Sequence, residues 1–366
     1  MNDVEAKSQS LLKEALGSGA SDIHLIPRRN DALVRLRIDQ ELTDTDTLSN
    51  RFSEKLISHF KFLAGMDIGE KRRPQNGALD MKIRHQSINL RLSTLPTPFG
   101  ESLVLRILPQ EQSYSLSELS LFPQTTRQLL TLMNPLNGFI LITGPTGSGK
   151  TTLLYTLLNE AVERFNRQVI TFEDPIEKKS DQFVQMQVNE KADITYAQGF
   201  KSILRHDPDV IMIGEIRDAE TAHLAVRAAM TGHLVLSTLH TSDSVGCVYR
   251  LLEFGIPLSY LEQTLTSVIA QRLVSLVCPY CGEVCRPECR MRRKTRRLGL
   301  FEILSGHPLE NFLSSLRETP EQPIQPKIQT IEDLLKRGVA SGYLSERNFA
   351  HRVGQAGSYG TLEKQR

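Results

Sequence analysis

The sequence predicts an α/β protein in which a small α+β domain precedes a larger domain built on a mainly parallel sheet. In the first part, segments in which apolar and polar residues alternate, as they do in half-buried strands, lie on either side of one helical segment. In the second part, wholly apolar stretches alternate with amphipathic helices, which is typical of a parallel sheet covered on both faces. A length of 366 residues corresponds to about two domains.

The N-terminal α+β domain is expected to occupy residues 1–110. The segment ALVRLRI alternates as a strand does, and residues 79–92 carry apolar side chains on one face of each arm of a hairpin. Between them, residues 50–68 have apolar side chains at helical spacing, and Ser49 or Asn50 can cap the helix.

A polar linker, residues 111–137, leads to the larger domain at residues 138–276. Its apolar runs FILIT, QVITF, VIMIG and HLVLST are predicted to be parallel strands. Residues 277–305 form a cysteine-containing subdomain, and residues 306–366 form a tail interrupted by prolines, with a helix near residues 330–336.

The composition narrows the function classes. A net charge of +2 gives no overall argument for binding nucleic acid or an anionic membrane. No apolar run approaches the roughly 20 residues that span a bilayer, and the N-terminus lacks a secretory signal. The clustered cysteines do not suit a disulfide framework, so we expect a cytoplasmic protein with reduced thiols.

A phosphate-binding loop follows the FILIT strand and opens a helix. The motif G-x-x-x-x-G-K-[ST] turns backbone N–H groups and a helix N-terminus toward phosphates. Lys150 is expected to meet the β- and γ-phosphates of ATP, Thr151 to bind Mg²⁺, and Thr152 to lie near the α-phosphate. The alternative is a glycine-rich turn that binds nothing. The expected nucleotide-binding residues are Gly144, Pro145, Thr146, Gly147, Ser148, Gly149, Lys150, Thr151 and Thr152.

Acidic side chains follow two of the predicted strands. Glu215 comes after VIMIG, while Glu173, Asp174 and Glu177 lie at the end of QVITF or just after it. Carboxylates at the carboxyl ends of parallel strands line the ligand crevice, so Glu215, Glu173 and Glu177 are candidates for holding Mg²⁺ or polarising the attacking water. The alternative is that they are helix N-terminal charges.

Two histidines flank the HLVLST strand. His233 opens it and His240 follows it. Each is either a structural histidine or, as a pair, a sensor of the γ-phosphate.

Four cysteines lie within twelve positions: Cys278, Cys281, Cys285 and Cys289. Four thiolates suit tetrahedral Zn²⁺, but the spacer is short and the second pair has three intervening residues. A metal-free, reduced loop is the alternative. Cys247 lies apart from them in a helix, as a core thiol does.

Several blocks in order resemble the secretion ATPases that drive type II secretion, type IV pili and competence pseudopili. The segments GPTGSGKTT, ITFEDPIE, IMIGEIRD and TGHLVLSTLHT resemble that family's Walker A, Asp, Walker B and His boxes. SDIHLIP, VRLRID, RRPQNGAL and LRLSTLPTPFGESLVLRIL resemble the strands of its first domain.

This resemblance implies a RecA-like P-loop ATPase domain and a homo-hexamer with ATP bound between the two domains. It further implies that Arg91 and Arg106 reach the phosphates, that Glu215, Glu173, Glu177, His233 and His240 serve the reaction, and that domain closure turns an inner-membrane platform protein. Pilin-like proteins are then indirect partners, and the ATPase lies at the inner face of the membrane.

Within the family, the short chain with a cysteine cluster most resembles the competence pseudopilus ATPases of Gram-positive bacteria. The alternatives are a pilus retraction motor, a type IV secretion ATPase and a non-enzymatic, nucleotide-gated scaffold. A further alternative is a DNA-binding motor that uses the basic run RMRRKTRR at residues 290–297, although such a run is more often a solvated face. We expect no direct binding of DNA.

Overall fold

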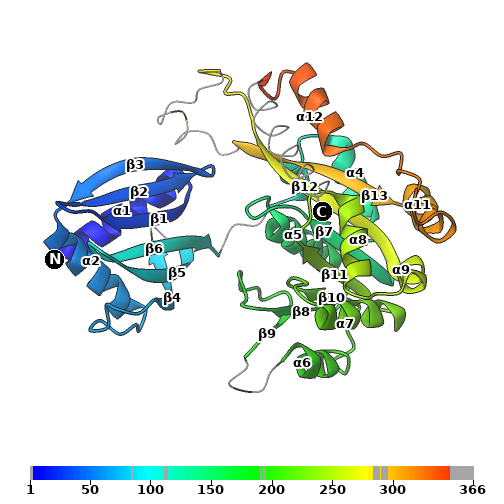
Figure 1. The fold of residues 1–366 in the computed structure, drawn as a ribbon, viewed down its shortest axis with the longest axis horizontal. Helices are drawn as coiled ribbons and strands as arrows, with labels where there is room; N and C mark the ends of the chain where they lie inside the picture. The colour runs from blue at the N-terminus through cyan, green and yellow to red at the C-terminus, as the bar shows by residue number, and fades with distance from the viewer. Residues whose placement is uncertain are drawn as a thin grey trace. The chain divides into compact units, whose positions relative to one another are not determined.

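The computed structural model describes residues 3–83, 86–110, 114–189, 192, 195–282, 289 and 296–346 (Figure 1). Contacts within the chain divide it into two compact units. The N-terminal unit consists chiefly of residues 1–112 and the C-terminal unit of residues 113–279 and 295–366. Each unit is described separately.

The N-terminal unit is an antiparallel sheet of six strands in the order β3-β2-β1-β6-β5-β4. Its elements are α1 (Asp3–Ser18), β1 (Ala20–Pro27), β2 (Ala32–Ile38), β3 (Glu41–Leu48), α2 (Asn50–Leu63), β4 (Gln75–Ile83), β5 (Gln86–Thr97) and β6 (Gly100–Pro109).

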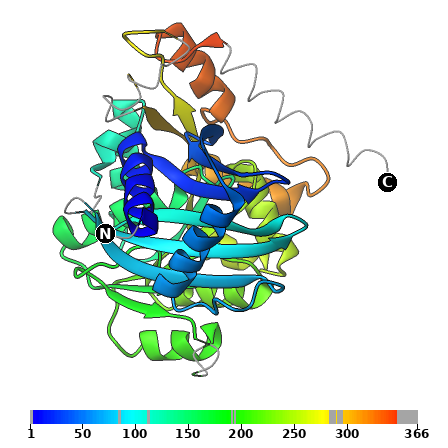
Figure 2. The same cartoon turned by 90° about the vertical axis from the view of Figure 1, so that its left-hand side faces the viewer.

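Both helices of this unit lie over one face of its sheet (Figure 2). Leu12 of α1 and Phe60 of α2 pack with strand residues such as Leu90 in one core. The predicted helix α2 is confirmed, and the Ser49 hydroxyl caps it by accepting from the Phe52 N–H. The predicted hairpin of β4 and β5 is confirmed as well. The sequence did not predict helix α1 or the polar strand β3, because the periodicity of apolar residues in both segments is weak.

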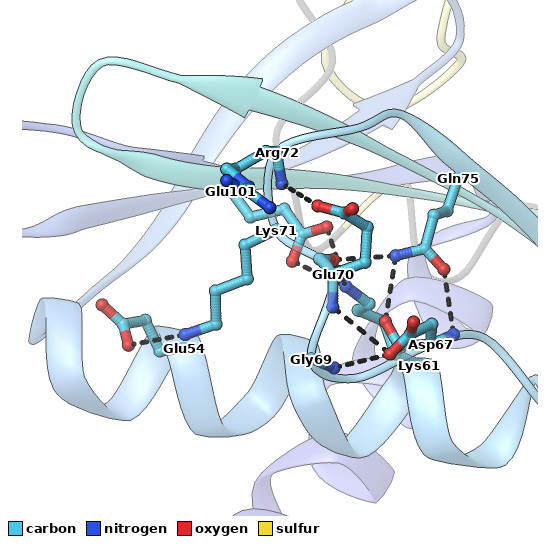
Figure 3. Close-up of polar contacts among 9 residues, drawn as sticks. All are labelled: Glu54, Lys61, Asp67, Gly69, Glu70, Lys71, Arg72, Gln75 and Glu101. Carbon is cyan, nitrogen blue, oxygen red and sulfur yellow. Dashed lines mark hydrogen bonds and ion pairs between the residues drawn. The ribbon is translucent and has the colours of Figure 1, made fainter.

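A buried ion pair organises the loop between α2 and β4 (Figure 3). The Lys61 ammonium lies 3.0 Å from a Glu101 carboxylate oxygen, and it also donates to the Glu70 carbonyl at 2.7 Å. The Gln75 amide closes the same loop by donating to the Asp67 and Glu70 carbonyls. Lys61 and Glu101 have side chains only 1% and 6% exposed, so the charges compensate each other inside the unit.

The C-terminal unit contains a seven-stranded sheet in the order β13-β12-β7-β11-β10-β8-β9. Its elements are α3 (Leu116–Leu119), α4 (Pro123–Thr131), β7 (Gly138–Thr143), α5 (Lys150–Glu163), β8 (Val169–Glu173), β9 (Val184–Gln187), α6 (Tyr196–Ile203), β10 (Val210–Ile213), α7 (Ala219–Met230), β11 (Leu234–Leu239), α8 (Ser244–Glu253), α9 (Leu258–Thr264), β12 (Leu265–Ser275), β13 (Arg297–Ser305), α11 (His307–Glu318) and α12 (Ile331–Ala340).

The predicted α/β architecture of this unit is confirmed. The four apolar runs form β7, β8, β10 and β11, and every strand pair is parallel except β12 with β13. Successive residues of β7 point to opposite faces. Phe139 and Leu141 share a core cluster with residues of α7 and α9, whereas Ile140 and Ile142 share one with residues of α5. The wholly apolar strands are therefore those that helices cover on both sides (Figure 1).

The edge of this sheet differs from the predicted organisation. Strand β13 (Arg297–Ser305) pairs with β12 along its whole length, so the last nine residues of the expected cysteine subdomain belong to the sheet. Residues expected as a linker include α3 and α4, which pack on the C-terminal unit through Leu116 and Leu129. The predicted tail helix is α12, and the Thr330 hydroxyl caps it by accepting from the Asp333 N–H.

Among the residues that the structure describes, no helix is both long enough and apolar enough to cross a bilayer.

Candidate active site

The phosphate-binding loop lies between β7 and α5, at the carboxyl end of the parallel strands. Gly144, Gly147 and Gly149 have φ angles of 147°, 75° and 90°, which L-residues with side chains rarely adopt. A Cβ atom on Gly144 would lie 2.5 Å from the Gln271 carbonyl oxygen, so strand β12 leaves no room for one. The glycines therefore let the loop turn tightly over β12, a conformation in which backbone N–H groups can bind a phosphate.

Lys150 begins α5 and is buried within this loop. Its ammonium donates to the carbonyls of Gly144 at 2.7 Å and Pro145 at 3.2 Å, and it lies 3.4 Å from His240 Nδ1. Burial lowers the pKa of Lys150 to about 8, and the Glu215 carboxylate partly opposes this shift. A buried ammonium whose contacts are with neutral groups is suited to an anionic ligand.

The loop fits a nucleotide phosphate in a second respect. The Ser148 hydroxyl is buried, and it has no hydrogen-bond partner among the described residues. It lies at the N-terminus of α5, where the helix dipole and the first N–H groups favour negative charge. A bound phosphate would supply acceptors for these donors, so the residues present fit the predicted ligand.

Glu215 and His240 meet beside Lys150. Glu215 follows β10 and His240 follows β11, so both stand at the carboxyl edge of the sheet. His240 Nε2 lies 3.3 Å from a Glu215 oxygen, and the other Glu215 oxygen pairs with Arg217. Lys150, His240 and Glu215 thus form a continuous set of polar contacts, as expected for groups that act on one phosphate.

Glu173 occupies a more enclosed position than Glu215. It ends β8 and is 3% exposed, and its carboxylate accepts from the Tyr155 and Thr171 hydroxyls, each at 2.7 Å. Burial raises the pKa of Glu173, and these hydrogen bonds oppose the rise. Glu177 lies four residues further along the chain and is exposed, and its charge raises the pKa of Lys150. Glu177 therefore lies within electrostatic range of the loop.

His233 is not brought to this group. It precedes β11 at the amino end, where its carbonyl accepts from the Gly138 N–H at the start of β7. Its Nδ1 atom lies 3.2 Å from both the Thr231 hydroxyl and the Ala228 carbonyl. A strand of this length separates the two ends by roughly 20 Å. Within one chain, the expected pair of histidines is therefore replaced by His240 alone.

Thr151 and Thr152 lie in the first turn of α5, each half-buried, beside Lys150. Their predicted roles toward Mg²⁺ and the α-phosphate stay predictions. Arg91 and Arg106 lie directly opposite each other on β5 and β6 of the N-terminal unit. Arg106 pairs with Asp22 at 2.9 Å and its side chain remains 59% exposed. Their predicted reach to the phosphates also stays a prediction.

Three of the predicted cysteine ligands lie together. The Sγ atoms of Cys278, Cys281 and Cys289 are within 4.8 Å of one another, close enough to share one metal ion. Cys285 lies outside the described residues, as do residues 290–295 of the basic run. Cys247 is fully buried in α8, as expected for a core thiol, and burial raises the pKa of that thiol.

Sequence reasoning missed the support that β12, β13 and α5 give to the site. Gln271 of β12 lies against Gly144 and Gly149, and Arg272 donates to the Ser242 carbonyl just beyond His240. On β13, Glu302 accepts from the Ser244 N–H at 2.9 Å and from the Ile331 N–H at 3.1 Å. The alternation of apolar residues before the cysteines could have predicted β12, because it continues the pattern of the strands.

For Tyr155, the only sequence signal of a place near the site was its position on the helix, one turn after the phosphate-binding motif.

Comparison with known proteins agrees with this geometry. The family described as Type II/IV secretion system protein matches residues 2–350. The chain is 48% identical to the competence protein ComGA of Bacillus subtilis over 95% of this chain and 98% of that protein. It is 45% identical to the type II secretion system protein E of Dickeya dadantii over 75% of this chain and 55% of that protein.

Solved structures show the same fold along the chain. The Legionella pneumophila ATPase DotB has a TM-score of 0.72 and 25% identity, with 94% of each chain covered. The pilus retraction motor PilT with bound ADP has a TM-score of 0.66 and 25% identity, covering 93% of this chain and 95% of that one. Together with the Lys150 loop and Glu215, these matches establish that the chain belongs to the type II/IV secretion ATPase family and is a homologue of the competence protein ComGA.

Proposed function

We propose that this ATPase powers the assembly of a competence pseudopilus or a related type IV pilus-like filament. The observation that carries the proposal is a phosphate loop with a buried, cationic Lys150 facing Glu215 and His240. The identity with ComGA along nearly the whole of both chains supports the competence branch.

In the proposed reaction, Lys150 and the N-terminus of α5 bind the phosphates of ATP. Glu215 orients the attacking water and accepts its proton, while His240 keeps the Glu215 carboxylate directed toward Lys150. Glu177 adds a second carboxylate near the same place, and Thr151 would hold Mg²⁺. When bound, this ion neutralises charge on the phosphates.

The mechanical part of the proposal rests on the family. We infer a homo-hexamer at the cytoplasmic face of the membrane, in which Arg91 and Arg106 bind phosphates and a membrane platform protein receives the motion. Pilin-like proteins are indirect partners. The three neighbouring thiols would hold Zn²⁺ together with Cys285, which fits the preference of that ion for thiolates.

Two substitutions test the ATPase site. Lys150→Ala removes the ammonium, so ATP binding should be lost. Glu215→Gln should bind ATP but hydrolyse it roughly tenfold more slowly or worse, since the proton acceptor is gone. Glu253→Gln, which alters an exposed carboxylate of α8, is the matched control. Full turnover in Glu215→Gln would move the catalytic role to another carboxylate.

A pilus retraction motor is the second candidate, favoured by the likeness to the structure of PilT. Deleting the gene separates the two. Loss of surface filaments and of DNA uptake supports an assembly ATPase, whereas accumulation of filaments supports a retraction motor.

A further inference from the structure

A buried polar cluster holds the loop that carries Glu177 against the helix that begins at the phosphate loop. The cluster consists of Tyr155 of α5, Thr171 and Glu173 of β8, and Gln185 of β9. All four belong to the C-terminal unit, and Tyr155, Thr171 and Glu173 are 5%, 0% and 3% exposed.

Tyr155 stands at the centre of these contacts. Its hydroxyl lies 2.7 Å from a Glu173 oxygen and 3.0 Å from the Lys178 carbonyl. The Gln185 amide donates to the Tyr155 hydroxyl at 3.2 Å and to the Lys178 carbonyl at 2.9 Å. One phenol thus connects α5 to the end of β8 and to the residue next to Glu177.

Strand β9 holds the remainder of the loop. The Ser180 N–H donates to the Gln185 side-chain oxygen at 2.7 Å, and the Ile176 N–H donates to that of Gln187 at 3.3 Å. The loop is therefore attached on both sides of Glu177 by side chains that come from regular elements. Side chains on rigid strands and helices position a neighbouring group more closely than loop contacts do.

The same helix carries the phosphate-binding residue. Lys150 is the first residue of α5, and Tyr155 lies five residues further along it. A regular helix fixes the distance between these two positions. The contacts of the Tyr155 hydroxyl with Glu173 and Lys178 therefore hold the loop at residues 174–180 in a defined position relative to Lys150.

We propose that Tyr155 is a positioning residue that sets the place of Glu177 relative to the phosphate loop. The proposal rests on the proposed role of Glu177 in ATP hydrolysis. Tyr155 itself is not required to touch the nucleotide, and it acts through the Lys178 carbonyl and Glu173. A buried phenol that only satisfies Glu173 would instead affect stability alone.

The test combines Tyr155→Phe with Glu177→Gln. Tyr155→Phe removes one hydroxyl and keeps the ring that packs against Phe183, while Thr171 and Gln185 still donate to Glu173. The variant is therefore expected to fold, which its melting curve checks. We expect kcat for ATP to fall about tenfold, within the range of a lost catalytic orientation, while the Kd of a fluorescent ATP analogue changes less than twofold.

The double variant decides whether the effect passes through Glu177. If Tyr155 acts by positioning Glu177, adding Tyr155→Phe to Glu177→Gln lowers kcat no further. Hydrogen exchange at residues 174–180 should also become faster in Tyr155→Phe. Tyr260→Phe is the matched control, since Tyr260 lies in α9 with a half-exposed ring, and it should change neither quantity.

Three results would overturn the proposal. Losses of kcat that multiply in the double variant would mean that Tyr155 acts independently of Glu177. Unchanged exchange at residues 174–180 would mean that the phenol does not hold the loop. Full turnover in Glu177→Gln alone would exclude a role of Glu177 in hydrolysis. The Lys150→Ala and Glu215→Gln variants would then still test the ATPase site independently.

Discussion

Lys61 in the N-terminal unit and Lys150 in the C-terminal unit are both buried, yet their surroundings differ. Lys61 meets the Glu101 carboxylate at 3.0 Å, and Figure 3 shows its contacts with Glu101 and with Glu70 of the adjoining loop. The described partners of Lys150 are two carbonyls and an imidazole nitrogen. A buried lysine in direct contact with a carboxylate stabilises the fold, whereas a buried lysine whose described contacts are carbonyls and an imidazole can bind an anionic ligand.

Removing Lys61 should give the largest effect on stability. Lys61→Met leaves the Glu101 carboxylate buried without its cation, and we expect a loss of about 3–5 kcal/mol in the free energy of unfolding. Chemical denaturation measures this loss. Lys71→Met is the control, because Lys71 and Glu54 form an exposed pair that contributes about 0–1 kcal/mol.

The double variant Lys61→Met with Glu101→Leu sharpens this result. Replacing both charges with apolar side chains removes the desolvation penalty, so most of the lost stability should return. If the double variant is as unstable as Lys61→Met alone, the shape of the loop rather than the buried charge explains the loss.

The pH dependence of nucleotide binding tests the other lysine. Burial lowers the pKa of Lys150 to about 8, so the free protein loses this positive charge as the pH rises through that value. Phosphate binding needs the charged form. The affinity for ADP should therefore weaken above pH 8, approaching about tenfold per pH unit, or about 1.4 kcal/mol.

Titration calorimetry at pH 8.5 in two buffers of different ionisation enthalpy checks this directly. Binding should take up protons, because the phosphates restore the charge on Lys150. Proton release, or an affinity that is constant between pH 7 and pH 9.5, would contradict the assignment.

Glu173 gives the smallest expected effect and completes the comparison with Glu101. Glu101 is paired with an ammonium, whereas the side-chain donors to Glu173 are neutral hydroxyls and an amide. The folded-state pKa of Glu173 is raised above its ordinary value of 4.5, so the stability it contributes is present below that value and is lost as the pH rises.

Glu173→Gln should remove this dependence. Relative to Glu173→Gln, the unmodified protein should lose stability as the pH rises from 4.5 toward neutrality. Thermal or urea unfolding at several pH values measures the difference. A difference that stays constant with pH, or one that grows in the opposite direction, would contradict a raised pKa for Glu173.

Local signals predicted much of this molecule. The apolar runs predicted the central strands, and the spacing of Gly144, Gly149 and Lys150 predicted the phosphate loop. Glu215 and His240 were predictable because the ends of parallel strands share one edge of the sheet.

Other features depend on contacts between distant segments. The pairing of β12 with β13 joins strands on either side of the cysteine segment, and no local pattern reports that register. The parallel direction of β11 places His233, which precedes that strand, at the edge of the sheet opposite to His240. The partners of Tyr155 come from β8, β9 and the loop between them, so a reading of α5 by itself finds only an apolar helix.

Glu302 connects the last described helix, α12, to the sheet that carries the candidate active site. Its carboxylate receives the first N–H of α8 and the first N–H of α12, and Leu334 and Leu335 of α12 pack over Leu121 and Leu300. A chain truncated before Ile331 would expose Leu121 and Leu300 to solvent. It would also remove the Ile331 N–H that donates to Glu302, beside the segment that follows His240. Helix α12 thus stabilises the carboxyl edge of the sheet, and its removal should perturb the nucleotide-binding residues there.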